Sequence, residues 1–337
     1  MSDPQEFRIK PLDGGRFRLE FRNPKSGGKV QTWDTAYPEN LIRLILEVRG
    51  PTSVIDEIQR DEDPRYVRAC LEMDISGYVD PQSLKGKRWL DFGCGGGAST
   101  TILARMFPDS PIVGIDLSER SLAIARARGH HFGYRNVEFL LSPSPDRPPP
   151  DLGTFDAILF SAVLEHLMPE ERRALLPLLW GLLNPGGVLF IDQTPWRYFP
   201  FEGHTTRLPL INYLPNRPAY SYARTLSGRV GADESWETLL RRGIRGGSVG
   251  QIGRILQSCC GSDFEFLTPN RLGLRDRVDL WYAGYAVSIA NKYPWARPIQ
   301  AFLRGLFKVV YWTTGAAVVP SLSLAIRKRP APGADIL

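Results

Sequence analysis

A short apolar strand that runs straight into a glycine-rich loop constrains the fold of this chain more than any other feature. The stretch from Arg88 to Ser99 reads RWLDFGCGGGAS, and helix-forming residues follow it to about Phe107. Glycine allows positive φ and close approach of the backbone to a ligand, and the first turn of a helix presents unpaired N–H groups. The stretch therefore predicts an α/β fold that binds a nucleotide-like cofactor on this loop.

One acidic residue beside the loop indicates which cofactor. Gly93, Gly95 and Ala98 have the spacing of a dinucleotide-binding loop. Asp91, however, stands two residues before the first glycine. A carboxylate there repels a pyrophosphate and attracts the ammonium and sulfonium groups of S-adenosylmethionine (SAM). These residues favour SAM, and an NAD-dependent oxidoreductase stays open as an alternative.

The strand and loop resemble motif I of the class I SAM-dependent methyltransferases, in which D-x-G-x-G-x-G follows the first strand. The matching residues are Asp91, Gly93, Gly95 and Gly97. The resemblance continues in order over residues 85–195, with an F-D strand at 155–160 and an L-N-P-G-G turn at 183–187. It implies an α/β Rossmann-like fold, with a mostly parallel seven-stranded sheet and helices on both faces. It also implies SAM as the cofactor and methyl transfer as the activity.

The same resemblance implies which residues hold SAM. Asp116 ends the second predicted strand, 112–116, about twenty residues past the loop, the spacing of a carboxylate that binds both ribose hydroxyls. Ser142 follows the third strand, 137–141, where the family usually has an acid near the adenine amino group. This position departs from the family pattern. The expected cofactor-binding residues are Asp91, Gly93, Cys94, Gly95, Asp116, Leu117, Ser142 and Ser161, although Cys94 also suits a small packing residue.

The loop after the fourth strand contains an acidic residue next to a histidine, Glu165 and His166. Some quinone-directed members of the family hold a divalent metal here with E-x-x-E-H, but Ala162 replaces the first glutamate. We therefore expect no metal. The Glu-His pair is interpreted as structural, next to the helix that begins near Pro169.

The segment from Asp192 to Leu210 leaves the fifth predicted strand, 188–191, at the edge where open parallel sheets bind their ligands. It is rich in aromatic residues and proline and contains His204, one of the 4 histidines of the chain. Methylation of an oxygen often requires removal of its proton, a task that suits histidine. We predict His204 as the general base, oriented by Glu202 or Asp192. The alternative is that His204 only holds the loop by hydrogen bonds.

The same segment resembles, more loosely, a methyltransferase subgroup with P-x-E-x-H-x-x-x-L-P, often associated with glycan and cell-surface polysaccharide functions. This resemblance favours O-methylation of a sugar, a lipid-linked or another small-molecule acceptor by direct SN2 transfer. No nucleic-acid partner is expected, because the chain lacks an appended RNA-binding motif and an N-P-P-(F/Y) tetrapeptide after the fourth strand. The net charge of +6 keeps an RNA methyltransferase as an alternative. A non-catalytic SAM-binding protein is another.

The regions that flank the motifs suggest how the chain is divided. Residues 1–80 predict a β-meander, with hairpin turns at 13–15 and 26–28, followed by a helical cover. Residues 81–337 predict the methyltransferase domain, with an acceptor-wall insertion at 194–247 and an apolar insertion at 269–320. The sixth and seventh strands are expected at 264–267 and 322–328.

Apolar residues dominate the second insertion. A run from Val309 to Ile326 has no charge, but polar residues and a proline dilute it, so a membrane span is not expected. An amphipathic hairpin within 275–320 that contacts a membrane surface is possible, and burial against the core or a dimer partner is the alternative. The first residues resemble no signal peptide, and the 4 cysteines form no C-x-x-C pair. We expect a cytoplasmic protein with possible membrane association, and no oligomeric state is predicted.

Overall fold

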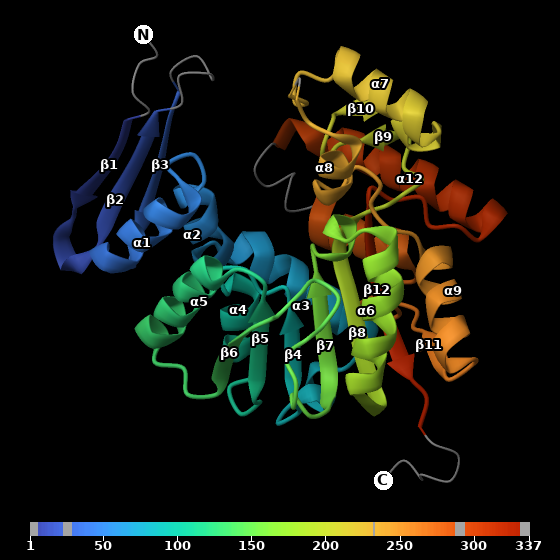
Figure 1. The fold of residues 1–337 in the computed structure, drawn as a ribbon, viewed down its shortest axis with the longest axis horizontal. Helices are drawn as coiled ribbons and strands as arrows, with labels where there is room; N and C mark the ends of the chain where they lie inside the picture. Colours follow the sequence, from blue (N-terminus) through green and yellow to red (C-terminus); the bar gives the residue numbers. More distant parts are fainter. Residues whose placement is uncertain (1–5, 23–28, 232, 287–293, 331–337) are drawn as a thin grey trace.

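A single sheet of seven strands lies at the centre of the computed structural model, which describes residues 6–22, 29–231, 233–286 and 294–330 (Figure 1). The strand order is β11-β12-β8-β7-β4-β5-β6. Five strands run parallel, and β12 is antiparallel to both of its neighbours. The prediction of a mostly parallel Rossmann-like sheet is confirmed. The strands are β4 (Trp89–Phe92), β5 (Ile112–Asp116), β6 (Val137–Leu141), β7 (Phe155–Ser161), β8 (Leu183–Pro195), β11 (Phe264–Phe266) and β12 (Ser321–Lys328).

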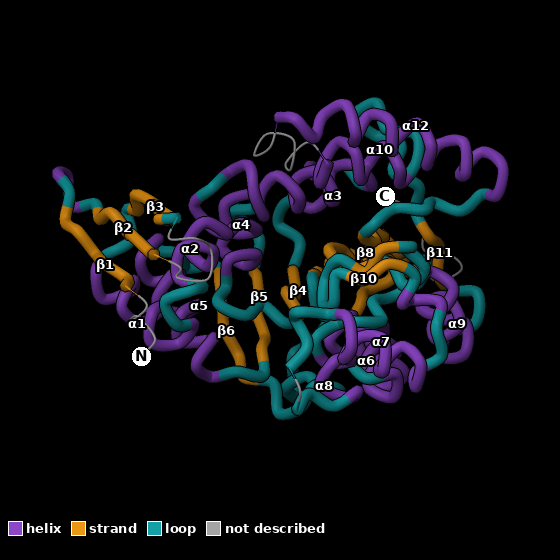
Figure 2. The backbone as a smooth tube through the Cα atoms, turned by 90° about the horizontal axis from the view of Figure 1, so that it is seen from above, coloured by secondary structure: helices purple, strands orange, loops and turns teal. Residues whose placement is uncertain are grey.

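Helices cover both faces of the sheet because every central strand is apolar on both sides (Figure 2). One face carries α3 (Ala69–Tyr78), α4 (Ala98–Met106) and α10 (Arg277–Trp281), and the other carries α6 (Pro169–Leu182) and α9 (Val249–Cys260). On the first face, Trp89 of β4 stacks between Phe107 and Phe190, with ring centroids 5.0 and 5.9 Å away. This packing fixes the strand that leads into the glycine loop.

The N-terminal region forms a small sheet of its own, as the alternating pattern predicts. Strands β1 (Glu6–Pro11), β2 (Phe17–Arg22) and β3 (Val30–Thr35) pair antiparallel in that order. Helices α1 (Glu39–Arg49) and α2 (Val54–Glu62) pack against this sheet, and their common core includes Ile124 of α5 (Glu119–Phe132). The N-terminal region is thus attached to the main domain through α5 (Figure 1). The predicted turn at 26–28 lies outside the described residues.

The fifth strand is longer than predicted at both ends. The expected turn over 184–187 belongs to β8, where Gly186 has a φ of 80° and the pairing with β7 shifts register. At the other end, Thr194 and Pro195 still pair with Leu322 and Ser321 of β12. Pairing with the seventh strand, β12, extends β8 beyond its predicted end. The segment that was predicted to leave the sheet as a loop therefore begins inside the sheet.

The remaining elements lie above the carboxyl ends of the parallel strands or on the apolar insertion. They are β9 (Phe201–Glu202), β10 (Leu208–Pro209), α7 (Asn216–Leu226), α8 (Trp236–Arg241) and α12 (Arg297–Thr314). Short turns of other helix types occur at Asp13–Gly15, Pro64–Arg68, Pro81–Leu84, Leu164–His166, Ile211–Tyr213, Tyr282–Ala286 and Pro294–Ala296. Within the described residues, none of the helices has the length and apolarity needed to cross a bilayer. Residues 287–293 of the insertion lie outside the described part.

Candidate functional site

The glycine loop between β4 and α4 has the positive φ angles that its sequence predicts. Gly93, Gly95 and Gly97 have φ values of 76°, 54° and 80°, a region that residues with a Cβ rarely adopt. The N–H groups of Gly93 and Cys94 both donate to the carbonyl of Ile115 on β5, at 2.8 and 2.9 Å. A Cβ on Gly95 would have only the Arg49 guanidinium within 4 Å, at 3.7 Å. The loop is therefore anchored to the sheet at its start and open at Gly95.

Asp116 lies at the end of β5 directly beside this loop. Its two carboxylate oxygens accept hydrogen bonds from the N–H groups of Gly95, at 2.9 Å, and Ser118, at 2.8 Å. Each oxygen of an ionised carboxylate has a second lone pair. The side chain is thus held in place while it keeps acceptor capacity for two hydroxyl groups, which is what binding a ribose requires.

Asp91 takes a different position from Asp116, since it is buried beneath the loop. One of its oxygens accepts hydrogen bonds from the hydroxyls of Ser99 and Thr100, both at 2.6 Å, and so ties the first turn of α4 to β4. Burial raises the pKa of Asp91 to about 6, although these two hydroxyls act to lower it. The thiol of Cys94 is buried as well. That Asp91 and Cys94 contact the cofactor directly remains a prediction.

A cavity of about 330 Å³, here called the loop cavity, adjoins the glycine loop. Predicted cofactor residues from several strand ends line it, namely Gly93, Asp116, Leu117 and Ser142. The Ser142 hydroxyl donates within its own turn, to the carbonyls of Ser144 and Arg147. Ser161 lies apart from this group and accepts a hydrogen bond from Gln193 at 3.2 Å. An open glycine, an oriented carboxylate and an adjoining cavity fit a SAM molecule.

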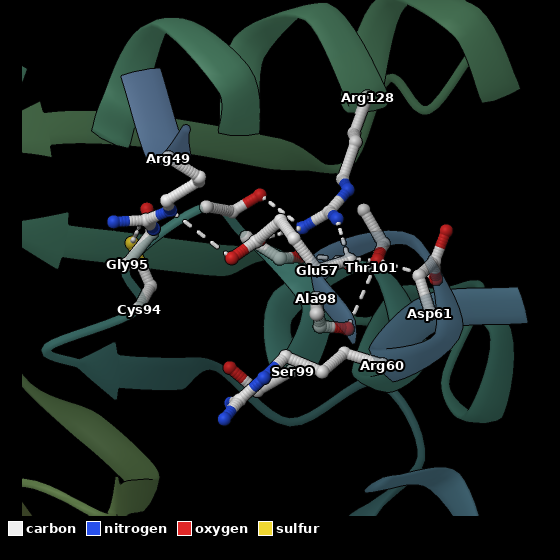
Figure 3. Close-up of polar contacts among 12 residues, drawn as sticks. Arg49, Glu57, Arg60, Asp61, Cys94, Gly95, Ala98, Ser99, Thr101 and Arg128 are labelled. Atoms are coloured by element: carbon white, nitrogen blue, oxygen red, sulfur yellow. Dashed lines mark hydrogen bonds and ion pairs between the residues drawn. The ribbon is translucent and has the colours of Figure 1, made fainter. Parts of the chain in front are cut away.

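A buried arginine joins this loop to the N-terminal helices, a contact that the sequence did not reveal (Figure 3). Arg128 of α5 is fully buried, and it donates to the carbonyl of Gly96 at 2.6 Å and to the Glu57 carboxylate of α2 at 3.0 Å. Arg49 of α1 pairs with the other oxygen of Glu57 at 3.1 Å. A Cβ on Gly96 would lie 2.3 Å from Glu57. The N-terminal helices therefore contact the loop itself.

A second and wider cavity, here called the large cavity, has a volume of about 1170 Å³. Its walls come from α1, α2, the glycine loop, the end of β8 and the segment around β9. Asp116, Ala162 and His166 line both cavities. The two spaces therefore meet at these residues, above the carboxyl ends of β5 and β7.

His204 lines the large cavity, and its nearest ring neighbour is His166, with centroids 5.7 Å apart. The pKa of His204 is lowered from its usual 6.5, chiefly because burial disfavours the cation and because His166 lies beside it. Glu202 acts in the opposite direction. At neutral pH the imidazole is therefore uncharged and able to accept a proton.

The two carboxylates expected to orient the His204 ring have other partners. Glu202 accepts the backbone N–H groups of His204, Thr205 and Thr206, at 2.9, 2.8 and 2.5 Å. It therefore holds the turn and not the ring. Asp192 is buried beside Asp74 of α3, and burial raises the pKa of each carboxyl. Its side chain therefore lies on the α3 side of the sheet, because residues of a strand alternate between its faces.

Three side chains that could serve as ligands gather beside the His204 ring. Glu165, His166 and His204 offer ligand atoms that all lie within 4.8 Å of one another. His166 Nδ1 donates to the carbonyl of Arg241 at 2.7 Å, which leaves Nε2 as an acceptor. One carboxylate oxygen of Glu165 accepts a hydrogen bond from Thr194 at 3.0 Å, while Oε1 is buried and has no hydrogen-bond partner among the described residues. The sequence places Glu165 and His166 next to each other, but only the fold adds His204.

Comparison with known proteins identifies one part of the chain. Residues 90–189 match a family profile described as a methyltransferase domain. The matched segment runs from β4 to β8 and contains the glycine loop, Asp116 and the loop with Glu165 and His166. The match agrees with the SAM prediction and not with the NAD alternative.

Several curated relatives are similar to part of this chain. A trans-aconitate 2-methyltransferase from Methylobacterium radiotolerans is 39% identical over 104 residues, or 31% of this chain and 36% of the relative. A ubiquinone biosynthesis O-methyltransferase from Bordetella avium is 35% identical over 110 residues, 33% of this chain and 44% of the relative. The chain thus spans less than half the length of these two relatives. A trans-aconitate 2-methyltransferase from Rhodopseudomonas palustris is 29% identical over 233 residues, 62% of this chain and 80% of the relative.

Proposed function

Because residues 90–189 are a SAM-dependent methyltransferase domain, we propose that the whole chain is an O-methyltransferase for a small-molecule acceptor bound in the large cavity. The observation that carries this proposal is the junction of the two cavities at Asp116, Ala162 and His166. A cofactor on the glycine loop and an acceptor in the large cavity would meet there, with His204 on the acceptor side.

SAM supplies a methyl group made electrophilic by a positively charged sulfur. The residues expected to hold it are Gly93, Gly95 and Asp116, with Leu117 and Ser142 along the loop cavity. The methyl transfer itself needs no covalent help from the protein. The contribution of the chain is to align the acceptor oxygen, to exclude water and to remove the proton.

His204 is the proton acceptor in this proposal. Its lowered pKa keeps the imidazole neutral at pH 7, and Glu202 holds the turn that carries it. The ring is partly open to the large cavity, so a hydroxyl of the acceptor can reach it. Asp192 has no place in this step, because its carboxyl is buried with Asp74.

The class of acceptor is narrowed by the walls of the large cavity. Trp196, Phe199 and Phe201 supply apolar surface, while Arg49 supplies hydrogen-bond donors. Of the curated relatives, one kind is named as a trans-aconitate methyltransferase and another as a methyltransferase of ubiquinone biosynthesis. Together with the resemblance to glycan-related enzymes, these features support an oxygen acceptor with an apolar part, such as a sugar, a quinone precursor or a lipid-linked molecule.

The proposal is tested with radiolabelled SAM and a panel of acceptors: trans-aconitate, catechol-type quinone precursors, free sugars, lipid-linked sugars and transfer RNA. We expect label in one of the small-molecule pools. His204→Ala should lower turnover by about 10²–10⁴-fold with unchanged SAM affinity. The matched control is His130→Ala, an exposed histidine on α5, which should leave turnover unchanged. Label in RNA alone, or full turnover by His204→Ala, would contradict the proposal.

A chelator separates two roles for the cluster of Glu165, His166 and His204. If His204 acts as the base, turnover persists in EDTA. If the cluster instead holds a divalent ion, EDTA abolishes turnover, and added Mg²⁺, Mn²⁺ or Zn²⁺ restores it. Calorimetric titration of the SAM-free protein with each ion gives a readout that does not depend on activity. Tight binding that is lost in Glu165→Gln would replace the base assignment by a metal site.

A further inference from the structure

Large apolar side chains project into solvent along one side of α12. They recur every three or four residues, the spacing of one helix face. Phe302 and Trp312 are 71% and 73% exposed. The residues of this kind on α12, which we call the α12 stripe, are Ile299, Phe302, Leu306, Val309 and Trp312.

Unlike an ordinary surface helix, α12 has apolar residues on both sides. Its inner face packs Phe307, Leu303 and Tyr311 on the protein. Arg304 and Lys308 form ion pairs with Asp279, at 2.7 and 2.6 Å, and Lys308 also pairs with Asp276. Both aspartates are buried on α10 or at its N-terminus. Normal helices bury their apolar face and expose their charges. Here one apolar face and two ion-paired cations already attach the helix to the protein, so the exposed stripe is a second apolar face.

The charge of the exposed side favours an anionic surface as that partner. The sequence of α12 contains no Asp or Glu, and its one remaining charged residue, Arg297, is exposed. Trp312 stands at the C-terminal end of the stripe, and tryptophan is enriched where helices lie at a lipid–water boundary. Aromatic and aliphatic side chains on one face with nearby cations are the pattern of helices that lie in the headgroup region.

A second copy of the chain fits this stripe less well. A helix of 18 residues is about 27 Å long, at 1.5 Å per residue. One face about 10 Å wide therefore offers roughly 300 Å², well below the roughly 800 Å² that each partner buries in a stable interface. A lipid surface has no such minimum area, because every inserted side chain adds its own transfer free energy.

We propose that the α12 stripe inserts into the headgroup region of an anionic phospholipid membrane. The helix then lies in the plane of the surface, with Arg304 and Lys308 still paired to the protein on the inner side. This sharpens the broader sequence expectation for 275–320 to one helix face. The arrangement also explains why a stretch without acidic residues precedes β12.

The helix that carries the stripe packs against a residue that lines the proposed acceptor site. Phe307, on the inner face of α12, packs edge-to-face on Phe199, with centroids 6.0 Å apart. Phe199 in turn lines the large cavity. Resting on the proposed methyltransferase function, a docked helix would hold the wall of this cavity next to the bilayer, which suits a lipid-linked acceptor. Membrane binding itself does not depend on that function.

The test is flotation of the full-length protein with vesicles, in the absence of SAM and acceptor. Vesicles of phosphatidylcholine with phosphatidylglycerol are compared with phosphatidylcholine alone at low salt. We expect the wild type to float with the anionic vesicles. Phe302→Ser and Trp312→Ser should each weaken binding at least about tenfold, because each removes a large inserted side chain. Trp312→Phe should retain binding.

Leu178→Ser is the matched control, because Leu178 is a 44% exposed apolar residue on α6, on the opposite side of the molecule from α12 (Figure 2). It should bind vesicles like the wild type. Equal binding by the stripe variants and the wild type, or no vesicle binding by the wild type, would overturn the proposal. A dimer seen by light scattering that Phe302→Ser dissociates, without vesicle binding, would identify a second copy as the partner. Because SAM is absent, none of these outcomes depends on methyl transfer.

Discussion

The guanidinium of Arg128 donates a 2.6 Å hydrogen bond to the carbonyl oxygen of Gly96, and this bond joins α5 to the middle of the glycine loop. The same guanidinium pairs with Glu57 of α2 at 3.0 Å and donates to the Tyr37 hydroxyl at 2.9 Å. Three segments far apart in the sequence therefore share one buried cation. The loop is held from the N-terminal side as well as from the sheet.

Replacing Arg128 should destabilise the protein and weaken cofactor binding together. Arg128→Met removes the cation and leaves Glu57 without one of its two arginine partners. Breaking a buried pair costs about 3–5 kcal/mol, so the free energy of unfolding should fall by about that amount in urea denaturation. The control Arg126→Met lies on the same helix in an exposed pair with Glu119 and should cost no more than about 1 kcal/mol. Equal losses in the two variants would argue against the buried network.

A methyl group on Gly96 should be poorly tolerated for a steric reason. Its Cβ would lie 2.3 Å from the Glu57 carboxylate and 3.2 Å from Arg128, both of which are held in the buried network. Gly96→Ala should therefore reduce both the melting temperature and SAM affinity. Gly181→Ala is the control, because its Cβ would meet nothing within 4 Å, and an alanine inside α6 should stabilise by about 1 kcal/mol. A neutral Gly96→Ala would show that α2 can move away from the loop.

The rate of methyl transfer should depend on pH through His204. Its pKa is lowered from the usual 6.5 by burial and by the neighbouring His166, so the base is protonated only at more acidic pH. Turnover should rise with pH and reach its plateau before pH 7, with a midpoint below 6.5. The measurement is the initial rate at saturating SAM between pH 5 and 8. In His204→Ala, the rise of the rate with pH over the acidic part of this range should disappear. A midpoint above 6.5 would be incompatible with the neutral, partly buried imidazole.

The carboxyl pair of Asp74 and Asp192 should make stability fall as the pH rises. Burial and the nearby Asp192 carboxyl raise the pKa of Asp74 above its usual 3.8. A carboxyl with a raised folded-state pKa contributes its full stability below the unfolded pKa and loses it as the pH rises through the folded value. Asp74→Asn keeps an acceptor for Ser323, which donates to this side chain at 2.8 Å, and removes the repulsion.

We therefore expect Asp74→Asn to be more stable than the wild type at pH 8 and to have a flatter dependence of stability on pH. Urea denaturation at pH 5 and pH 8 measures both effects. Asp109→Asn, at an exposed position, should follow the wild-type dependence. If Asp74→Asn is less stable than the wild type at pH 8, the Asp74 carboxyl is a structural requirement and not a source of repulsion.

The positions of the main-sheet strands along the chain were predictable from the sequence because each strand has a local signal. The central strands are apolar runs that end in turn residues, and β12 alternates at period two, so residues 321–328 matched the expected seventh strand within one residue. The extent of β8 was not predictable. Its extension to Pro195 depends on hydrogen bonds to β12, which lies more than a hundred residues later in the sequence.

The partners of the candidate catalytic side chains were less accessible to sequence reasoning. Glu202 stands two residues from His204, and that spacing suggested a contact with the ring. In the structure the carboxylate instead binds the backbone N–H groups of the turn. His166 lies 38 positions earlier in the sequence, yet its ring is the nearest neighbour of His204. Spacing along a loop does not determine which way its side chains point.

The sequence by itself determined the type of fold, the position of the glycine loop and the preference for SAM, because these depend on short contiguous patterns of apolar residues, glycine and acids. Only the tertiary structure decided which distant groups meet: Arg128 with Gly96, His166 with His204, and Asp74 with Asp192. It also decided that Arg304 and Lys308 of α12 pair with aspartates of α10 and its N-terminus. The reason is physical, since local patterns select an element, whereas long-range packing selects the neighbours of each of its faces.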